Sequence, residues 1–143
     1  MANIITTEVL WVIFLTGVLP TLLWLFFWLR EDRFRPEPTG LLVLTFFAGV
    51  CATFLVLPLE QFIGGAGIIG TERVFLFAVA EEIVKFGVVF LVCFRSSYID
   101  EPIDYAIYLI TGALGFAAAE NVMFLLAPSM QQNISFIIEA GTL

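Results

Sequence analysis

Four long apolar runs dominate the chain, and each is bounded by charged or polar residues. They cover residues 9–29, 40–59, 74–94 and 105–127. A helix rises about 1.5 Å per residue, so each run is long enough to cross a hydrocarbon core of about 30 Å. A segment in lipid has to satisfy its own backbone hydrogen bonds, which favours helices. The pattern predicts an all-α, polytopic membrane helix bundle with four transmembrane helices, in which Pro20 and Pro58 kink or end their spans.

The positive charges between these runs are distributed unequally. Residues 30–39 contain three arginines and residues 95–104 contain one, whereas the opposite side has Arg73 alone. Cytoplasmic loops of membrane proteins carry an excess of basic residues. We therefore expect the N-terminus outside, residues 30–39 and 95–104 in the cytoplasm, and residues 1–143 in a single transmembrane domain.

The composition agrees with this fold class and excludes several functions. The chain is 61% hydrophobic, has a mean hydropathy of +1.04 and carries a net charge of −7. Soluble domains are far less apolar, and a nucleic-acid partner would require a basic face. The sequence contains no histidine, which excludes a Ser-His-Asp triad, a Cys-His pair and an HExxH zinc helix within these residues. Cys51 and Cys93 lie inside apolar runs, and we interpret them as small buried side chains.

Two local patterns are interpreted as structural. Gly65, Gly67 and Gly70 spell GxGxxG, but a dinucleotide site needs that motif between a strand and a helix. Between two membrane spans these glycines are better explained as turn residues, so we expect no nucleotide ligand. Asp100 before Pro102 is typical of a helix start, with the aspartate as N-cap and the proline in the first turn.

Ionisable side chains inside apolar spans are the strongest functional signal. The third run contains Glu81, Glu82 and Lys85, and the fourth contains Glu120. Such residues are costly in a membrane and usually mark a site or a pathway. Lys85 follows the two glutamates by four and three residues, which places all three side chains on one side of a helix. A structural Glu–Lys–Glu network and an ion or proton pathway are the alternatives to a catalytic carboxylate site.

The two acidic helices are expected to be neighbours. Glu82 would lie about 12 Å below the outer surface and Glu120 about 10 Å below it. Gly112, Gly115 and Ala119 form a face of small residues that lets another helix approach closely. We therefore predict that spans three and four are adjacent, with Glu81 or Glu82 facing Glu120 across a small polar pocket.

Paired carboxyl groups in such a site can divide acid and base roles. In a low-dielectric environment one carboxyl can stay protonated while a partner beside Lys85 stays ionised. An acid–base pair of this kind can activate water and protonate a leaving amine. Asn121 is a secondary candidate, as a donor to a developing oxyanion.

The same residues resemble the motifs of a known family. Glu81-Glu82-Ile-Val-Lys85 resembles the EExxK motif, and Phe116-Ala-Ala-Ala-Glu120 the FxxxE motif, of the PrsW intramembrane proteases, relatives of the CAAX-processing and bacteriocin-processing membrane proteases. Residues 32–38 and 101–104 are similar to further stretches of that family. The resemblance covers about residues 20–127.

The resemblance implies a multi-pass endopeptidase of the bacterial plasma membrane that cleaves membrane-anchored proteins such as anti-sigma factors. Glu81 would be the water-activating base, Glu82 and Glu120 would polarise or protonate, and Lys85 would tune the pair. The family places histidine on later helices, which this sequence lacks, so zinc is implied by resemblance only and the residues themselves support no cofactor. We expect a C-terminally truncated, N-terminal part of a longer protease that is inactive alone. An ion- or proton-coupled carrier and a catalytically incomplete binding or scaffold protein are the rival functions.

Overall fold

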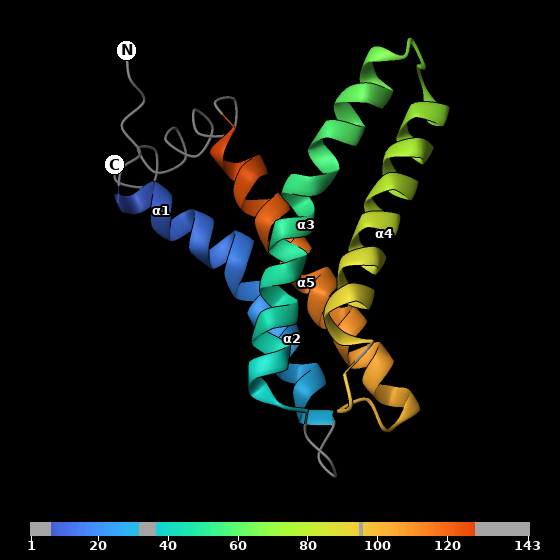
Figure 1. Ribbon diagram of the computed structural model, residues 1–143. Helices are drawn as coiled ribbons and strands as arrows, with labels where there is room; N and C mark the ends of the chain where they lie inside the picture. The colour runs from blue at the N-terminus through green and yellow to red at the C-terminus, as the bar shows by residue number, and fades with distance from the viewer. Residues whose placement is uncertain (1–6, 32–36, 95, 128–143) are drawn as a thin grey trace.

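The computed structural model describes residues 7–31, 37–94 and 96–127, and all regular structure in these ranges is helical. The elements are α1 (Thr7–Ile13), the π-helical segment η1 (Phe14–Val18), α2 (Leu19–Glu31), α3 (Thr39–Gly65), α4 (Thr71–Cys93) and α5 (Pro102–Leu126). Figure 1 shows that α1, η1 and α2 form one continuous helical rod. The predicted all-α class is confirmed for the described residues.

Three stretches are long and apolar enough to cross a membrane. They are Thr7–Arg30, Thr39–Gly65 and Pro102–Leu126. They correspond to the first, second and fourth predicted spans, with ends that differ by a few residues. The helix α4 matches the third predicted span in position but is not among the three, since Glu81, Glu82 and Lys85 interrupt its apolar character.

The two prolines do not end their helices. Pro58 lies inside α3, which continues to Gly65 and is therefore longer than the predicted run that ended at Leu59. Pro20 follows η1, where the Leu19 amide donates to the carbonyl of Phe14, five residues earlier. A proline ring clashes with the carbonyl four residues before it, and a wider π-helical turn accommodates that clash.

The two connections around α4 confirm one structural interpretation and correct another. Gly67 and Gly70 have φ angles of +75° and +69°, a conformation that favours glycine, so the GxGxxG stretch is a turn. The N-cap of α5 is Glu101 and not Asp100 as predicted, with Pro102 at the start of the helix. The Asp104 carboxylate accepts the backbone amides of Asp100 at 2.9 Å and Glu101 at 2.8 Å, which places the cap one residue later.

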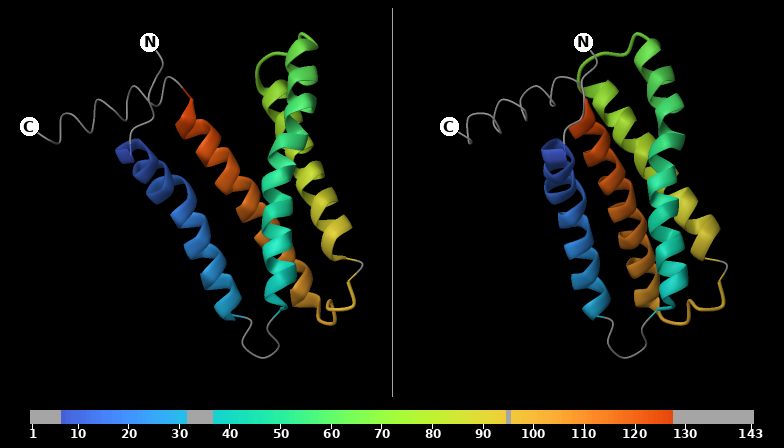
Figure 2. Two further views of the ribbon diagram at one scale, coloured as in Figure 1. Left: turned by 60° about the vertical axis from the view of Figure 1, so that its left-hand side comes forward. Right: turned by 90° about the vertical axis from the view of Figure 1, so that its left-hand side faces the viewer.

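The central helix of the bundle is α3. Both α4 and α5 pack most extensively against α3 and less against each other, and α2 packs on the other side of α5 (Figures 1 and 2). The close approach of α3 and α5 depends on glycine: a Cβ atom on Gly49 would lie 2.0 Å from the Gly112 carbonyl oxygen, and one on Gly115 would lie 2.0 Å from the Phe46 carbonyl oxygen. The predicted small-residue face of α5 is thus a helix contact. α3 packs on it at Gly115, whereas a Cβ atom on Gly112 would lie 2.4 Å from a side-chain carbon of Val89 on α4.

Helices that are consecutive in the chain run in opposite directions, so α3 and α5 run parallel to each other (Figure 2). The start of α1, the α3–α4 turn and the end of α5 lie at one end of the bundle, and the α4–α5 connection lies at the other (Figure 2). At that second end Tyr108, which is fully buried, donates its hydroxyl to the buried Glu37 carboxylate. This hydrogen bond ties the segment before α3 to α5, so Glu37, a residue of one family-like stretch, has a structural role.

The outer surface of the bundle is apolar. Trp11, Trp24 and Phe62 are 60%, 57% and 78% exposed, as expected for side chains that face lipid. Cys51 also lies on this surface, so the prediction that both cysteines are buried is wrong for this residue. Cys93 is buried as predicted, with its Sγ atom 2.7 Å from the Thr45 hydroxyl.

Candidate active site

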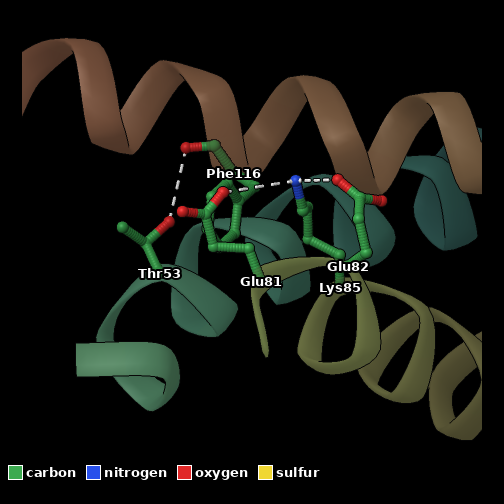
Figure 3. Close-up of polar contacts among 5 residues, drawn as sticks. All are labelled: Thr53, Glu81, Glu82, Lys85 and Phe116. Carbon is green, nitrogen blue, oxygen red and sulfur yellow. Dashed lines mark hydrogen bonds and ion pairs between the residues drawn. The ribbon is translucent and has the colours of Figure 1, made fainter. Parts of the chain in front are cut away.

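The charged residues of α4 share one side of the helix, as their spacing predicts. The Lys85 Nζ atom lies 2.5 Å from a Glu82 carboxylate oxygen and 3.9 Å from a Glu81 carboxylate oxygen (Figure 3). The two glutamates differ in their surroundings: the Glu82 side chain is 74% exposed, whereas that of Glu81 is only 25% exposed. Glu81 is therefore the acid that faces the interior of the bundle, a distinction that the sequence left open.

The two family-like motifs meet through Lys85 and Phe116. The Nζ atom of Lys85 lies 4.5 Å from the centroid of the Phe116 ring, a cation–π distance. Phe116 is 1% exposed, and its backbone carbonyl accepts a hydrogen bond of 3.3 Å from the hydroxyl of Thr53 on α3 (Figure 3). Residues of α3, α4 and α5 thus converge on one point of the bundle.

Glu120 lies one helical turn after Phe116 and lines a cavity of about 290 Å³ between α3 and α5. Thr53 and Glu60 of α3 line the same cavity, together with Met123 and Phe124 of α5. The other lining residues are Val56 and Leu57. The wall is therefore mostly apolar, with two carboxyl groups set into it.

The predicted pocket between spans three and four differs from the one observed. Glu120 lies within electrostatic range of Glu81, Lys85 and Glu82. However, neither α4 glutamate lines the cavity of Glu120, and no hydrogen bond joins Glu120 to them in the described part of the chain. The reason is that α4 and α5 both pack chiefly on α3 and less on each other, so their acidic residues do not line one shared pocket.

Sequence reasoning missed Glu60. It lies within electrostatic range of Glu81 and Glu120, which makes it the fourth acid of this region besides Glu81, Glu82 and Glu120. The sequence placed it outside the second span, because its own charge ended the apolar run of residues 40–59. Its position four residues after Val56, a buried residue of α3, is the signal that could have revealed an inward-facing side chain.

Asn121 lies on another face of α5. Its side-chain amide donates to the Gly17 carbonyl in η1 at 3.2 Å. This bond joins α5 to the first helical rod, and the structure does not bring Asn121 to Glu81 or Lys85. A role for Asn121 as an oxyanion donor therefore gains no support from its position.

A second cavity of about 360 Å³ opens between α4 and α5. It is lined by Glu82, Lys85, Phe86, Val89, Leu109, Ile110 and Ala113. Two cavities thus lie near the contact between Lys85 and Phe116. Glu82 lines one of them and Glu120 lines the other. This arrangement places ionisable groups at the walls of two separate cavities.

Comparison with known proteins identifies relatives over most of the chain. Residues 37–142 match the sequence profile of a family described as PrsW family intramembrane metalloprotease. A protein named Protease PrsW from Geobacillus kaustophilus is 30% identical over 122 residues, which cover 83% of this chain and 54% of that protein. Proteins of the same name from Bacillus subtilis and Clostridioides difficile are 23% and 27% identical, over 80% and 82% of this chain.

The matched region includes every residue of the candidate site, but it covers only part of the length of each relative. The chain spans about half the length of the curated relatives that it matches, since 52–54% of each relative is covered. No solved structure matches the chain significantly.

The residues present do not form a recognisable metal site. Within residues 7–31, 37–94 and 96–127, no group of three or more histidine, cysteine, aspartate or glutamate side chains is arranged to hold a metal ion. Zinc sites in proteases use at least three protein ligands, usually with histidine among them, and this sequence contains no histidine. The ionisable groups that the described residues bring to this site are carboxyl groups and the Lys85 ammonium group.

Proposed function

The chain belongs to the PrsW family of membrane proteases, and from that premise we propose that it hydrolyses peptide bonds of membrane-anchored proteins with the carboxyl groups of Glu81 and Glu120. The observation that carries this proposal is the meeting of the EExxK and FxxxE motifs at the contact between Lys85 and Phe116. This contact brings the acids of α4 and α5 into electrostatic range of one another. The substrate class, a membrane-anchored regulator such as an anti-sigma factor, is part of the proposal and rests on the family.

Glu81 is the general base in this proposal. Its carboxylate takes a proton from water, the water oxygen bonds to the carbonyl carbon of the substrate, and the C–N bond then breaks. Glu120 delivers a proton to the leaving amine from the other side of the site. General acid–base catalysis of this kind contributes about 10²–10⁴-fold to a rate.

The positive charge of Lys85 lowers the energetic cost of placing carboxylates within an apolar helix. A buried carboxylate is costly unless a positive charge and hydrogen bonds compensate it. Lys85 is the only lysine in the sequence, and it lies between Glu81 and Glu82 at 3.9 Å and 2.5 Å. Glu82, whose side chain is exposed, is the closest partner of Lys85, and we propose that it pairs with Lys85 instead of acting on water.

The helix α4 is proposed as a further membrane span in addition to the three apolar stretches, and it is the third span in chain order. Its 23 residues suffice to cross a hydrocarbon core, and it lies alongside α3 and antiparallel to it (Figure 2). The charges that distinguish it from the other spans are those of the proposed site. With the N-terminus outside, the turn at Gly65–Gly70 lies outside and the α4–α5 connection lies in the cytoplasm.

Cysteine labelling tests this orientation. Cys51 and Cys93 are first replaced by alanine, and single cysteines are placed at exposed positions in the two connections, Ser97 and Gly65. A membrane-impermeant maleimide should label Gly65→Cys in intact cells and Ser97→Cys only after the membrane is opened. Arg33→Cys, which lies outside the described residues, should behave like Ser97→Cys.

The reverse labelling pattern would invert the topology and move the site to the inner half of the bilayer. Labelling of both positions from one side would instead contradict α4 as a membrane span.

An ion- or proton-coupled carrier is the rival function, because Glu60 and Glu120 line one cavity and both lie within electrostatic range of Glu81. Both functions can be tested on the same proteoliposomes, which contain the protein expressed from its own gene and a membrane-anchored reporter. The proposal predicts a cleaved reporter and an unchanged pH gradient. An intact reporter together with a gradient that the protein dissipates would establish the carrier.

A further inference from the structure

Lys85 and Phe116 form the contact that joins the charged face of α4 to the helix of Glu120. α4 and α5 pack less against each other than against α3, and no hydrogen bond links their acidic residues in the described part of the chain. The alignment of Glu81 with Glu120 therefore depends on other contacts between the two helices. Among the described residues, the cation–π contact of 4.5 Å is the α4–α5 contact that involves a charged group of the site, beside the apolar packing of Val84 and Val88 near Phe116.

The Phe116 ring is held rigidly enough to act as a support. It is 1% exposed and belongs to a buried cluster with Ala52 and Val56 of α3. Its backbone carbonyl also accepts the Thr53 hydroxyl at 3.3 Å, which ties the same turn of α5 to α3. Ala80, Val84 and Val88 of α4 pack against the same cluster, so the ring is held between α3 and α4. Glu120 follows Phe116 by one turn on α5.

Lys85, in contrast, has a choice of positions. Its long side chain is flexible, and its closest partner is Glu82, at 2.5 Å, whose side chain is 74% exposed. Glu81 is further away, at 3.9 Å from the same nitrogen. Without an attraction toward the interior, the ammonium group would follow Glu82 outward and leave Glu81 without its cation.

We propose that Phe116 is a positioning residue, whose ring holds the Lys85 ammonium group over the interior of the bundle, between Glu81 and the turn of α5 that carries Glu120. The negative face of an aromatic ring attracts a cation, and this attraction is larger where water is excluded. The importance of the contact for cleavage rests on the proposed function, whereas the position of Lys85 can be measured without any activity.

Fluorinated phenylalanines at position 116 test this role without changing the shape of the core. Successive fluorine atoms on the ring weaken its attraction for a cation while the side chain keeps nearly its volume. Because Lys85 is the only lysine in the sequence, a membrane-permeant amine reagent followed by peptide mass spectrometry reports on this one side chain. We expect the labelling rate to rise stepwise with fluorination, by about tenfold for the trifluorinated ring.

Phe116→Leu is the second variant, and Phe75→Leu is its control, because Phe75 is 65% exposed on α4. Phe116→Leu should raise Lys85 labelling as much as the trifluorinated ring, and Phe75→Leu should leave it unchanged. In the cleavage assay the fluorinated series should lower kcat about tenfold with little change in KM, since the ring touches Lys85 and not the substrate.

The two readouts separate the two claims. Labelling that is constant across the fluorinated series would overturn the positioning role, whatever the activity. Labelling that rises in a protein that cleaves no reporter would support the positioning role and contradict the proposed protease function. A kcat that falls in parallel with the rise in labelling supports both.

Discussion

Replacing Glu81 by glutamine is expected to lower cleavage of a membrane-anchored reporter by at least about 100-fold, with substrate binding retained. The amide keeps the size of the side chain but cannot take a proton from water, and removal of a general base costs about 10²–10⁴-fold. Glu81 is the better buried of the two adjacent glutamates, with 25% of its side chain exposed. The measurement is the initial rate of product formation in membranes that contain equal amounts of each variant.

Two further variants give this result its meaning. Glu82→Gln should produce a smaller loss, about tenfold, because it removes the closest partner of Lys85 and leaves the proposed base in place. Glu72→Gln removes a charge from the first turn of α4, away from the site, and should cleave at the wild-type rate. If Glu81→Gln retained more than about a tenth of the wild-type rate, Glu81 could not be the base.

The largest structural effect is expected at the crossing of α3 and α5. Gly115→Ala would place a methyl carbon only 2.0 Å from the Phe46 carbonyl oxygen, so the two helices would have to separate. Overpacking usually costs about 1–3 kcal/mol, and a clash between backbones belongs at or above the upper end of that range. We expect the melting temperature in detergent to fall by about 10 °C or more.

Gly87→Ala is the matched control on α4. Nothing lies within 4 Å of a Cβ atom at Gly87, and alanine is the better helix former by about 1 kcal/mol. Its melting temperature should equal or exceed that of the wild type. Equal melting temperatures for the two variants would contradict the close α3–α5 crossing on which the position of Glu120 depends.

The helices of this protein can be predicted from its sequence because the length and spacing of apolar residues within each segment indicate its structure. Apolar runs located all four long helices to within a few residues at most ends, and the spacing of Lys85 after Glu81 and Glu82 predicted their shared face. These properties depend only on the length and period of a single segment.

The arrangement of the helices was harder to predict, because it depends on pairs of segments. The small residues of α5 were recognised, but nothing in the sequence identifies Gly49 of α3 as their partner. Sequence order and similar depth favoured α4 as the main neighbour of α5, whereas α3 is the central helix. Glu60 was missed because its charge ends the apolar run of residues 40–59, whereas α3 continues past it to Gly65.

Hydrolysis in water enriched in oxygen-18 tests the central claim most directly. The protein, expressed from its own gene and reconstituted with a membrane-anchored reporter, should cut a peptide bond within the membrane-embedded segment of the reporter. Mass spectrometry should find one oxygen-18 atom in the new carboxyl terminus, because the proposed base acts on a water molecule. An intact reporter, or a product that Glu81→Gln forms at the wild-type rate, would contradict the account.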